Sequence, residues 1–270
     1  MKNKLSRFAV PYEVWMAIFV VAPIVIMVAY AFSSADGGFT LDNFVQMGGY
    51  TEVFLRSFKL AIIATVICLL IGYPVSYLMS REGASFQRTA MVLIMLPMWM
   101  NFLLRTMAWQ TLLEKNGVIN SVLSFLHLPS LNLINTPGAI ILGMVYNFLP
   151  FMVLPIYNSL TKIDQNVINA ARDLGANSVH TFFKITLPLS LPGVISGITM
   201  VFVPALTTFV ISTLLGGSKI LLIGNVIEQE FTQTGNWHLG SGLSMVLMLF
   251  IIVNMVLSAI FDKEGEANAL

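Results

Sequence analysis

Long apolar runs alternate with short polar segments along most of the chain. About 20 predominantly apolar residues are enough to cross the hydrocarbon core of a bilayer as a helix, and six runs reach that length. These runs predict membrane-spanning helices near residues 13–32, 58–80, 89–113, 137–159, 189–212 and 242–261. The pattern therefore predicts an all-α, polytopic membrane protein with a single transmembrane domain over residues 1–270.

Prolines interrupt several of these runs. Pro97 falls in the third, Pro150 and Pro155 in the fourth, and Pro204 in the fifth. Such prolines are tolerated in membrane helices when neighbouring helices cover the freed backbone groups. The segment "LPLSLPG" at 187–193 lies at the start of the fifth run, and we expect "LPLSLP" to end the short helix that precedes it.

Composition supports the membrane assignment. Hydrophobic residues make up 57% of the chain and charged residues only 10%, against about 25% charged residues in soluble domains. The net charge of +1 gives no argument for nucleic-acid binding. One cysteine, Cys68, excludes a disulfide framework, and the three dispersed histidines have no metal-binding spacing. We therefore expect neither a metal nor a cofactor on this chain.

The distribution of Lys and Arg predicts the orientation, because cytoplasmic loops carry the excess of these residues. Given the six spans, nine fall on one side of the membrane: Lys2, Lys4, Arg7, Arg81, Arg88, Lys162, Arg172, Lys184 and Lys263. The other side holds five: Arg56, Lys59, Arg105, Lys115 and Lys219. Both termini, and the loop between spans four and five, are therefore predicted to face the cytoplasm.

The first run has a second interpretation. "AYAFSS" resembles a signal-peptide cleavage site at Ala31. The apolar stretch from Val14 to Phe32 is longer than a usual signal-peptide core, and cleavage would leave five spans. We therefore expect the run to be retained as an anchor helix.

The loop at 160–188 is unusually polar for this chain. Asp164 is suited to cap a helix that runs to Leu174, and Gly175 suits the left-handed position that ends helices. Val167, Ile168, Ala171 and Leu174 would form an apolar stripe along that helix. Residues 177–185 predict a second short helix. Two readings of this unit stay open: an amphipathic connector on the lipid headgroups, or a knob that docks into a soluble partner.

The same loop resembles a family motif. Asn169-Ala170-Ala171, three residues, Gly175, nine residues and then Ile185-Thr186-Leu187-Pro188 follow the spacing of the EAA loop of ABC importer permeases. Asn169 is the one departure, because the family usually has Glu there. The resemblance implies a type I ABC importer permease fold with a cytoplasmic coupling helix. It further implies that the following residues contact the ATPase: Asn169, Ala170, Ala171, Arg172, Asp173, Leu174 and Gly175.

Four further segments, 63–80, 96–113, 147–160 and 204–227, resemble the B-type permeases of spermidine/putrescine importers. This resemblance implies a subunit in the plasma membrane of a prokaryote that carries polyamines. It implies as partners a second, C-type permease, two ATPase subunits and an extracellular or periplasmic polyamine-binding protein.

The chain has no nucleotide-binding loop of its own. "GGSK" at 216–219 lacks the spacing and the final Ser or Thr of a G-x-x-x-x-G-K-[ST] motif. ATP and magnesium are therefore expected on the partner ATPase, and this chain is expected to be a non-catalytic permease subunit.

The cargo path is harder to place. No Asp or Glu lies in the middle of spans two to six, although sites for organic cations usually combine carboxylates with aromatic faces. We expect the acidic groups to come from the partner permease, and this chain to offer rings and neutral acceptors. The candidates are Asn101, Trp109, Tyr146, Asn147, Thr207, Thr208 and Phe209. Lipid contact or helix packing is the alternative for each of them.

Arg105 stands apart from these candidates. It is expected to extend outward to the membrane surface, or to pair with Glu114 or with another subunit. Two alternatives to a polyamine importer permease remain: a permease for another small cationic or organic solute, and a stand-alone secondary transporter. The second would need intramembrane acids or a repeat-based site, and neither is found in the sequence.

Overall fold

The computed structural model describes residues 10–34 and 36–267, with the side chains of 218 and of 261–267 left undescribed. Lys2, Lys4 and Arg7, and the side chain of Lys263, lie outside this description. The predicted orientation of the termini therefore stays a prediction.

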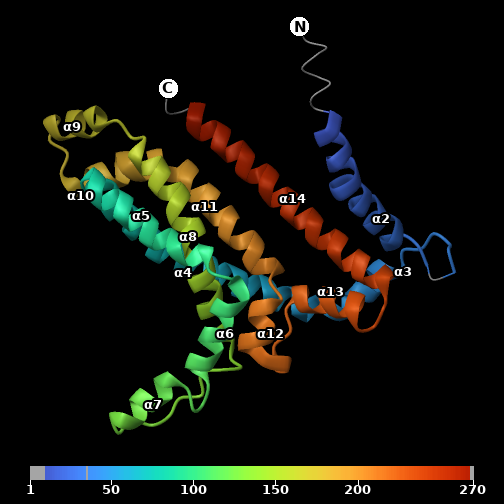
Figure 1. Ribbon diagram of the computed structural model, residues 1–270. Helices are drawn as coiled ribbons and strands as arrows, with labels where there is room; N and C mark the ends of the chain where they lie inside the picture. Colours follow the sequence, from blue (N-terminus) through green and yellow to red (C-terminus); the bar gives the residue numbers. More distant parts are fainter. Residues whose placement is uncertain (1–9, 35, 268–270) are drawn as a thin grey trace. The chain divides into compact units, whose positions relative to one another are not determined.

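The described residues are almost entirely helical (Figure 1). A first helix covers Val10–Ala31 and includes α2 (Ala22–Ala31). The other helices are α3 (Asp42–Gln46), α4 (Thr51–Arg81), α5 (Ala84–Trp99), α6 (Phe102–Leu113), α7 (Val118–Phe125), α8 (Pro137–Thr161), α9 (Gln165–Asp173), α10 (Ser178–Thr181), α11 (Leu187–Thr207), α12 (Val210–Gly216), α13 (Ile223–Thr232) and α14 (Trp237–Ala267). Between residues 10 and 267, outside position 35, the β structure amounts to one isolated bridge between Ser33 and Phe39.

The described chain contains five or six helical stretches that could span a membrane. Five helical stretches are long and apolar enough to span: Val10–Ala31, Asp42–Arg81, Pro137–Thr161, Ser178–Thr207 and Trp237–Ile260. The bent pair Ala84–Trp99 and Phe102–Phe125 makes six if it counts as one span. The prediction of an all-α membrane protein is confirmed.

The chain divides into two compact units. One consists of Met1–Glu52 and Val226–Ile251, and the other of Val53–Asn225 and Ile252–Leu270. In the first unit, the ring of Tyr30 lies 6.1 Å from that of Trp237 and 5.3 Å from that of His238. Tyr50 donates a hydrogen bond to Glu230 (3.1 Å). These contacts join the end of α2 and the segment before α4 to α13 and α14 within this unit.

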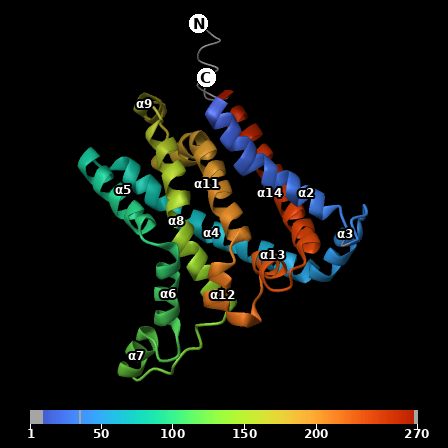
Figure 2. The same cartoon turned by 45° about the vertical axis from the view of Figure 1, so that its right-hand side comes forward.

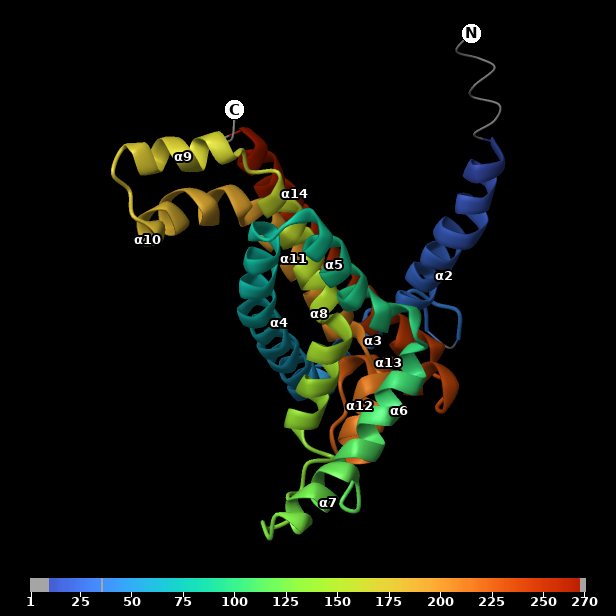
Figure 3. The ribbon, with the colours of Figure 1, turned by 60° about the vertical axis from the view of Figure 1, so that its left-hand side comes forward.

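The second unit is a bundle of α4, α5, α8 and α11 (Figures 1 and 3). Its centre is Met152 of α8, which is fully buried. A Cβ built on Gly72 of α4 would lie 2.9 Å from Met152 Cγ, and one built on Gly197 of α11 would lie 2.8 Å from its sulfur. Ser76 also donates to the carbonyl of Val153 (3.0 Å). Small residues on α4 and α11 thus allow both helices to approach α8 closely.

The predicted third span, 89–113, is broken. Helix α5 ends at Trp99, and α6 begins at Phe102 after a bend of 90° to the α6–α7 segment. Asn101 caps α6, because its side chain accepts from the backbone N–H groups of Leu103 (2.9 Å) and Leu104 (3.2 Å). These bonds satisfy donors that a helix start otherwise leaves free.

The fifth span differs from its prediction at both ends. We expected a helix over 189–212 after a break at "LPLSLP", but the helix runs from Ser178 to Thr207. A π-helical turn at Phe182–Thr186 leads into α11, and Pro188 lies in the first turn of α11. The widened turn changes the backbone hydrogen-bond pattern just ahead of the proline, so the helix continues through a sequence that looked like a stop.

At the other end, the helix stops at Thr208, whose backbone is extended. Buried Asn225 holds this break in place. Its side chain accepts from Ser212 and from the Leu222 N–H, and donates to the Phe209 carbonyl (3.1 Å) and to Thr213 (2.7 Å). One amide thus joins the break, α12 and the start of α13.

Replacing Asn225 with alanine is expected to destabilise the protein by about 3 kcal/mol, because each buried polar group left without a partner costs about 1–3 kcal/mol. Thermal unfolding in detergent measures the loss. Asn158→Ala, at an exposed position of α8, is the control and should change little. Equal melting temperatures for the two variants would show that the Asn225 amide does not hold the break.

Candidate functional site

The segment 164–188, here called the knob, consists of α9, α10 and the start of α11. It lies at the end of the bundle opposite α7, and α9 and α10 run side by side there (Figure 3). The turn between α4 and α5 lies at the same end (Figures 2 and 3). The segments that the sequence assigned to the cytoplasm in the middle of the chain therefore share one end of this unit.

Local sequence signals shape the knob. The Asp164 side chain accepts from the Asn166 N–H (2.9 Å) at the start of α9, and Asn177 does the same for the His180 N–H (2.8 Å) at the start of α10. Gly175 has φ +84°. The predicted cap and left-handed glycine are both confirmed.

The turn at Gly175 is fully hydrogen-bonded. Its N–H donates to the carbonyl of Arg172 (2.9 Å), and the N–H of Ala176 donates to that of Ala171 (3.0 Å). This pair of bonds is the Schellman motif, which ends a helix at a fixed angle. The knob is therefore held by its own backbone rather than by contacts with a partner.

The predicted apolar stripe of α9 is divided in the structure. Ile168 is buried, whereas Val167 is 45% exposed and Leu174 is 90% exposed. Val179 and Phe183 of the second helix are also exposed. One apolar side chain thus anchors α9, and the others remain on the surface, where they are available for contact with lipid or protein.

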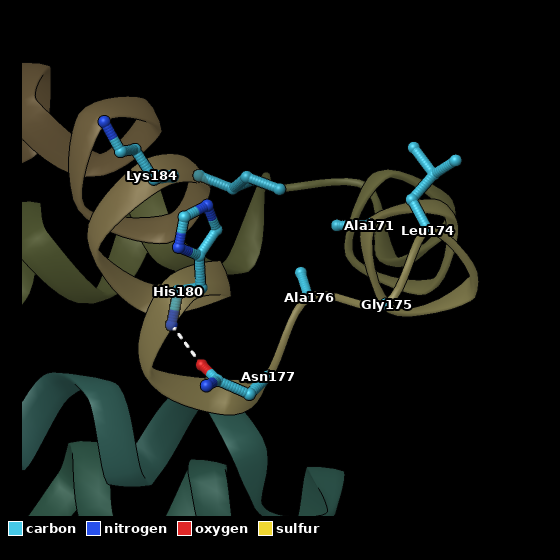
Figure 4. Close-up of a pocket in the computed structure, with 8 residues that line it drawn as sticks. Ala171, Leu174, Gly175, Ala176, Asn177, His180 and Lys184 are labelled. Atoms are coloured by element: carbon cyan, nitrogen blue, oxygen red, sulfur yellow. Dashed lines mark hydrogen bonds between the residues drawn. The ribbon is translucent and has the colours of Figure 1, made fainter.

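A groove of about 470 Å³ separates α9 from α10 (Figure 4). Ala171 of α9 and Ala176 of the connecting turn line it, and Asn177, His180 and Lys184 line it from the second helix and its start. Small alanines leave the groove open, and the polar groups along its wall offer hydrogen bonds. A protein surface could seat a side chain between the two helices.

The remaining predicted residues of the knob, Asn169, Ala170, Arg172 and Asp173, are all exposed. Asn169 therefore presents a neutral amide at the position where the motif usually has a carboxylate. Arg172 and Asp173, with opposite charges, lie in the last turn of α9. This surface is free to contact another subunit.

The predicted cargo-path residues fall into separate groups. Trp109 and Tyr146 are in edge contact, with ring centroids 5.3 Å apart. Asn101 uses its side-chain oxygen to cap α6. Thr207, Thr208 and Phe209 lie at the break after α11. Trp109 and Tyr146 line one groove together, between α6 and α8.

Asn147 lies within the packed core of α8 and is 2% exposed. Its amide donates to the carbonyl of Gly143 (2.9 Å), while its side-chain oxygen has no hydrogen-bond partner among the described residues. In this conformation Asn147 does not face an open path.

Arg105 was expected to extend to the surface, but it is buried. It is 7% exposed, and within residues 10–267 no ion pair joins it to Glu114. Its helix, α6, turns this face toward α8 and Tyr146. The bend at Asn101 turns this face of α6 toward α8, which the apolar pattern of the sequence did not reveal.

Comparisons with known proteins identify the class. The profile of the family described as the inner membrane component of binding-protein-dependent transport systems matches residues 72–263. The chain belongs to this family of importer permeases.

Two relatives cover almost the whole chain. The spermidine/putrescine transport system permease protein PotB of Haemophilus influenzae is 37% identical, over 98% of each chain. PotB of Escherichia coli is 36% identical, over 93% of this chain and 97% of its own. The inner membrane ABC transporter permease protein YdcU of Escherichia coli is 28% identical over 81% of this chain.

Solved structures share the fold. A bacterial ABC transporter for import of the acidic polysaccharide alginate superposes with a TM-score of 0.76, at 18% identity, over 96% of this chain and 95% of the matched one. The MetNI methionine ABC transporter superposes with a TM-score of 0.60, also at 18% identity, over 82% and 97%. These likenesses establish the architecture of an ABC importer permease for this chain.

Proposed function

We propose that this chain is the B-type transmembrane subunit of an ATP-driven importer of spermidine and putrescine. The observation that carries the proposal is the 37% identity to a PotB permease over 98% of both chains, because an alignment of this extent includes every span and the knob. The chain acts with a second, C-type permease, two ATPase subunits and a polyamine-binding protein outside the membrane. It is not itself an enzyme, and ATP and magnesium are bound by the ATPase.

The knob couples movement of the ATPase to movement of the transmembrane helices. Its exposed apolar residues and the groove beside Ala171 dock into the ATPase, with Asn169, Ala170, Ala171, Arg172, Asp173, Leu174 and Gly175 forming the contact surface. When two ATPases close on ATP, the docked knob is displaced. The helix that begins at Ser178 continues without interruption to Thr207, so a displacement of the knob tilts the whole of this span.

The helix geometry makes this coupling physically direct. A connector that ended at "LPLSLP" would leave a flexible joint between knob and span. The structure instead has a π-helical turn that leads into α11, and Tyr73 of α4 is hydrogen-bonded to Ser190 of α11 (2.9 Å). Motion at the knob is therefore expected to reach α4 as well as α11.

The cargo passes beside the break at Thr207, Thr208 and Phe209, whereas Trp109 and Tyr146 line the groove of the Arg105 cation. Aromatic faces attract organic cations, and the C-terminal end of a helix, here α11, attracts positive charge. Asn101 is exposed, and its side-chain oxygen caps α6. Asn147 is buried, so it lines the path only in a state in which its surroundings open. The carboxylates for a polyamine come from the second permease, since spans two to six of this chain contain none.

Uptake of radiolabelled spermidine and putrescine tests the proposal. The four components are expressed in bacteria that lack their own polyamine importers. Uptake is expected with wild-type ATPase and is lost when the ATPase cannot hydrolyse ATP. If uptake of a different small cation or organic solute appears in place of both polyamines, the cargo assignment is wrong. Uptake that persists with the dead ATPase would favour a secondary transporter.

A further inference from the structure

Arg105 is a buried cation without a counter-charge. It is 7% exposed, and its Nε and Nη1 have no hydrogen-bond partner in the part of the chain that the structure describes. The guanidinium of arginine carries a fixed positive charge in proteins. Two buried guanidinium nitrogens without an acceptor are unfavourable, so an anionic group from outside the described chain would stabilise this site.

The groove around Arg105 lies between α6 and α8 and has a volume of about 210 Å³. Leu104, Arg105, Ala108, Trp109 and Leu112 line it from one face of α6, and Tyr146 lines it from α8. No carboxylate is among the lining residues. Glu114 follows the C-terminal end of α6, about two and a half turns from Arg105.

The composition of this groove favours a protein partner. Arg, Trp, Tyr and Met are the residue types enriched in the cores of protein–protein interfaces. Met100 and Leu104 at the rim are more than half exposed, and would seal a charged pair from water. The proposed cargo is a cation, which a guanidinium repels, so cargo is an unsuitable occupant.

We propose that Arg105 forms an ion pair with a carboxylate of the second permease subunit in this groove. The inference rests on the proposed function, which supplies that subunit. A side chain of the partner enters between α6 and α8, its carboxylate meets the guanidinium, and Trp109 and Tyr146 pack against its stem. Such a pair fixes the register of the two permeases, since a buried charge accepts one partner and excludes misaligned ones.

Charge reversal with rescue tests this pairing in the assembled complex. Arg105→Glu is expected to lower the second permease recovered with this chain by about tenfold or more, which equals about 1.4 kcal/mol of association free energy. Each Asp and Glu in the spans of the second permease is then replaced by Arg, one at a time. Replacement at one position should restore recovery to about the wild-type level. Arg56→Glu, at an exposed arginine of α4, is the control and should leave recovery unchanged.

Two results would overturn the pairing: wild-type recovery with Arg105→Glu, or no restoring position in the second permease. If Arg105→Glu does not fold, a benzophenone amino acid at position 104 of the otherwise wild-type chain tests the pairing by photo-crosslinking. On illumination it should attach to the second permease, whereas attachment to lipid alone would show that the groove faces the bilayer and its phosphates. Recovery of the second permease is measured without cargo. If the pairing is intact but polyamine uptake fails, the cargo assignment alone is overturned.

Discussion

Replacing Leu174 with aspartate is expected to abolish coupling while leaving the fold intact. Leu174 is 90% exposed, so its removal should change the free energy of unfolding by no more than about 0.5 kcal/mol. A carboxylate at the centre of a docking surface, however, loses apolar contact and adds a desolvation cost, as at interface hot spots. ATP-dependent uptake and recovery of the ATPase with the complex should both fall by about tenfold or more, since about 1.4 kcal/mol is tenfold.

The matched control is Leu126→Asp, which introduces the same carboxylate beside α7. That residue is 57% exposed and lies at the opposite end of the bundle from the knob (Figure 1). This variant should retain the ATPase. If Leu174→Asp also retains the ATPase and full uptake, the knob does not dock through its exposed apolar tip. A lower melting temperature for Leu174→Asp would instead indicate a structural role.

Replacing Gly193 with leucine is expected to destabilise the bundle more than Leu174→Asp does. Gly193 lies where α11 meets α8, the most extensive helix pair of the second unit. A Cβ there would come within 2.5 Å of Ser159 Cβ and 2.6 Å of the Pro155 carbonyl oxygen. Because one neighbour is backbone, the two helices must separate. Overpacking of this kind costs about 1–3 kcal/mol or more, and thermal unfolding in detergent should show a lower midpoint.

Gly83→Leu is the control for this change. Gly83 has a negative φ of −68°, and a Cβ there meets nothing within 4 Å. It precedes α5 at the knob end of the bundle, so the same side chain is added without a clash. If Gly193→Leu unfolds at the same temperature as Gly83→Leu, the close approach of α8 and α11 does not stabilise the bundle.

Local chemistry made much of the knob predictable. Asp164 and Gly175 act through hydrogen bonds and backbone angles within a few residues of themselves, so the sequence around each is sufficient. The long apolar runs were also predictive, because a bilayer imposes a minimum length on any helix that crosses it. The family motif then added the partners, which neither periodicity nor composition indicates.

Features that depend on tertiary packing were not predictable. "LPLSLP" has the form of a helix stop, yet a π-helical turn carries the helix through it. Arg105 in an apolar run suggested a residue that reaches the surface, but the 90° bend after Trp99 turns its helix against α8. Asn225 gave no signal at all, since its role arises from four groups on different segments. In each case the deciding contact is distant in sequence.

The side of the membrane on which the knob lies is the most direct test of the coupling account. Cys68, the one cysteine of the sequence, is fully buried, so a cysteine at position 174 provides a selective target for a membrane-impermeant maleimide. The account predicts no labelling of intact cells, labelling of inverted vesicles stripped of the ATPase, and protection when the ATPase is restored. Labelling of position 174 from outside intact cells would contradict it.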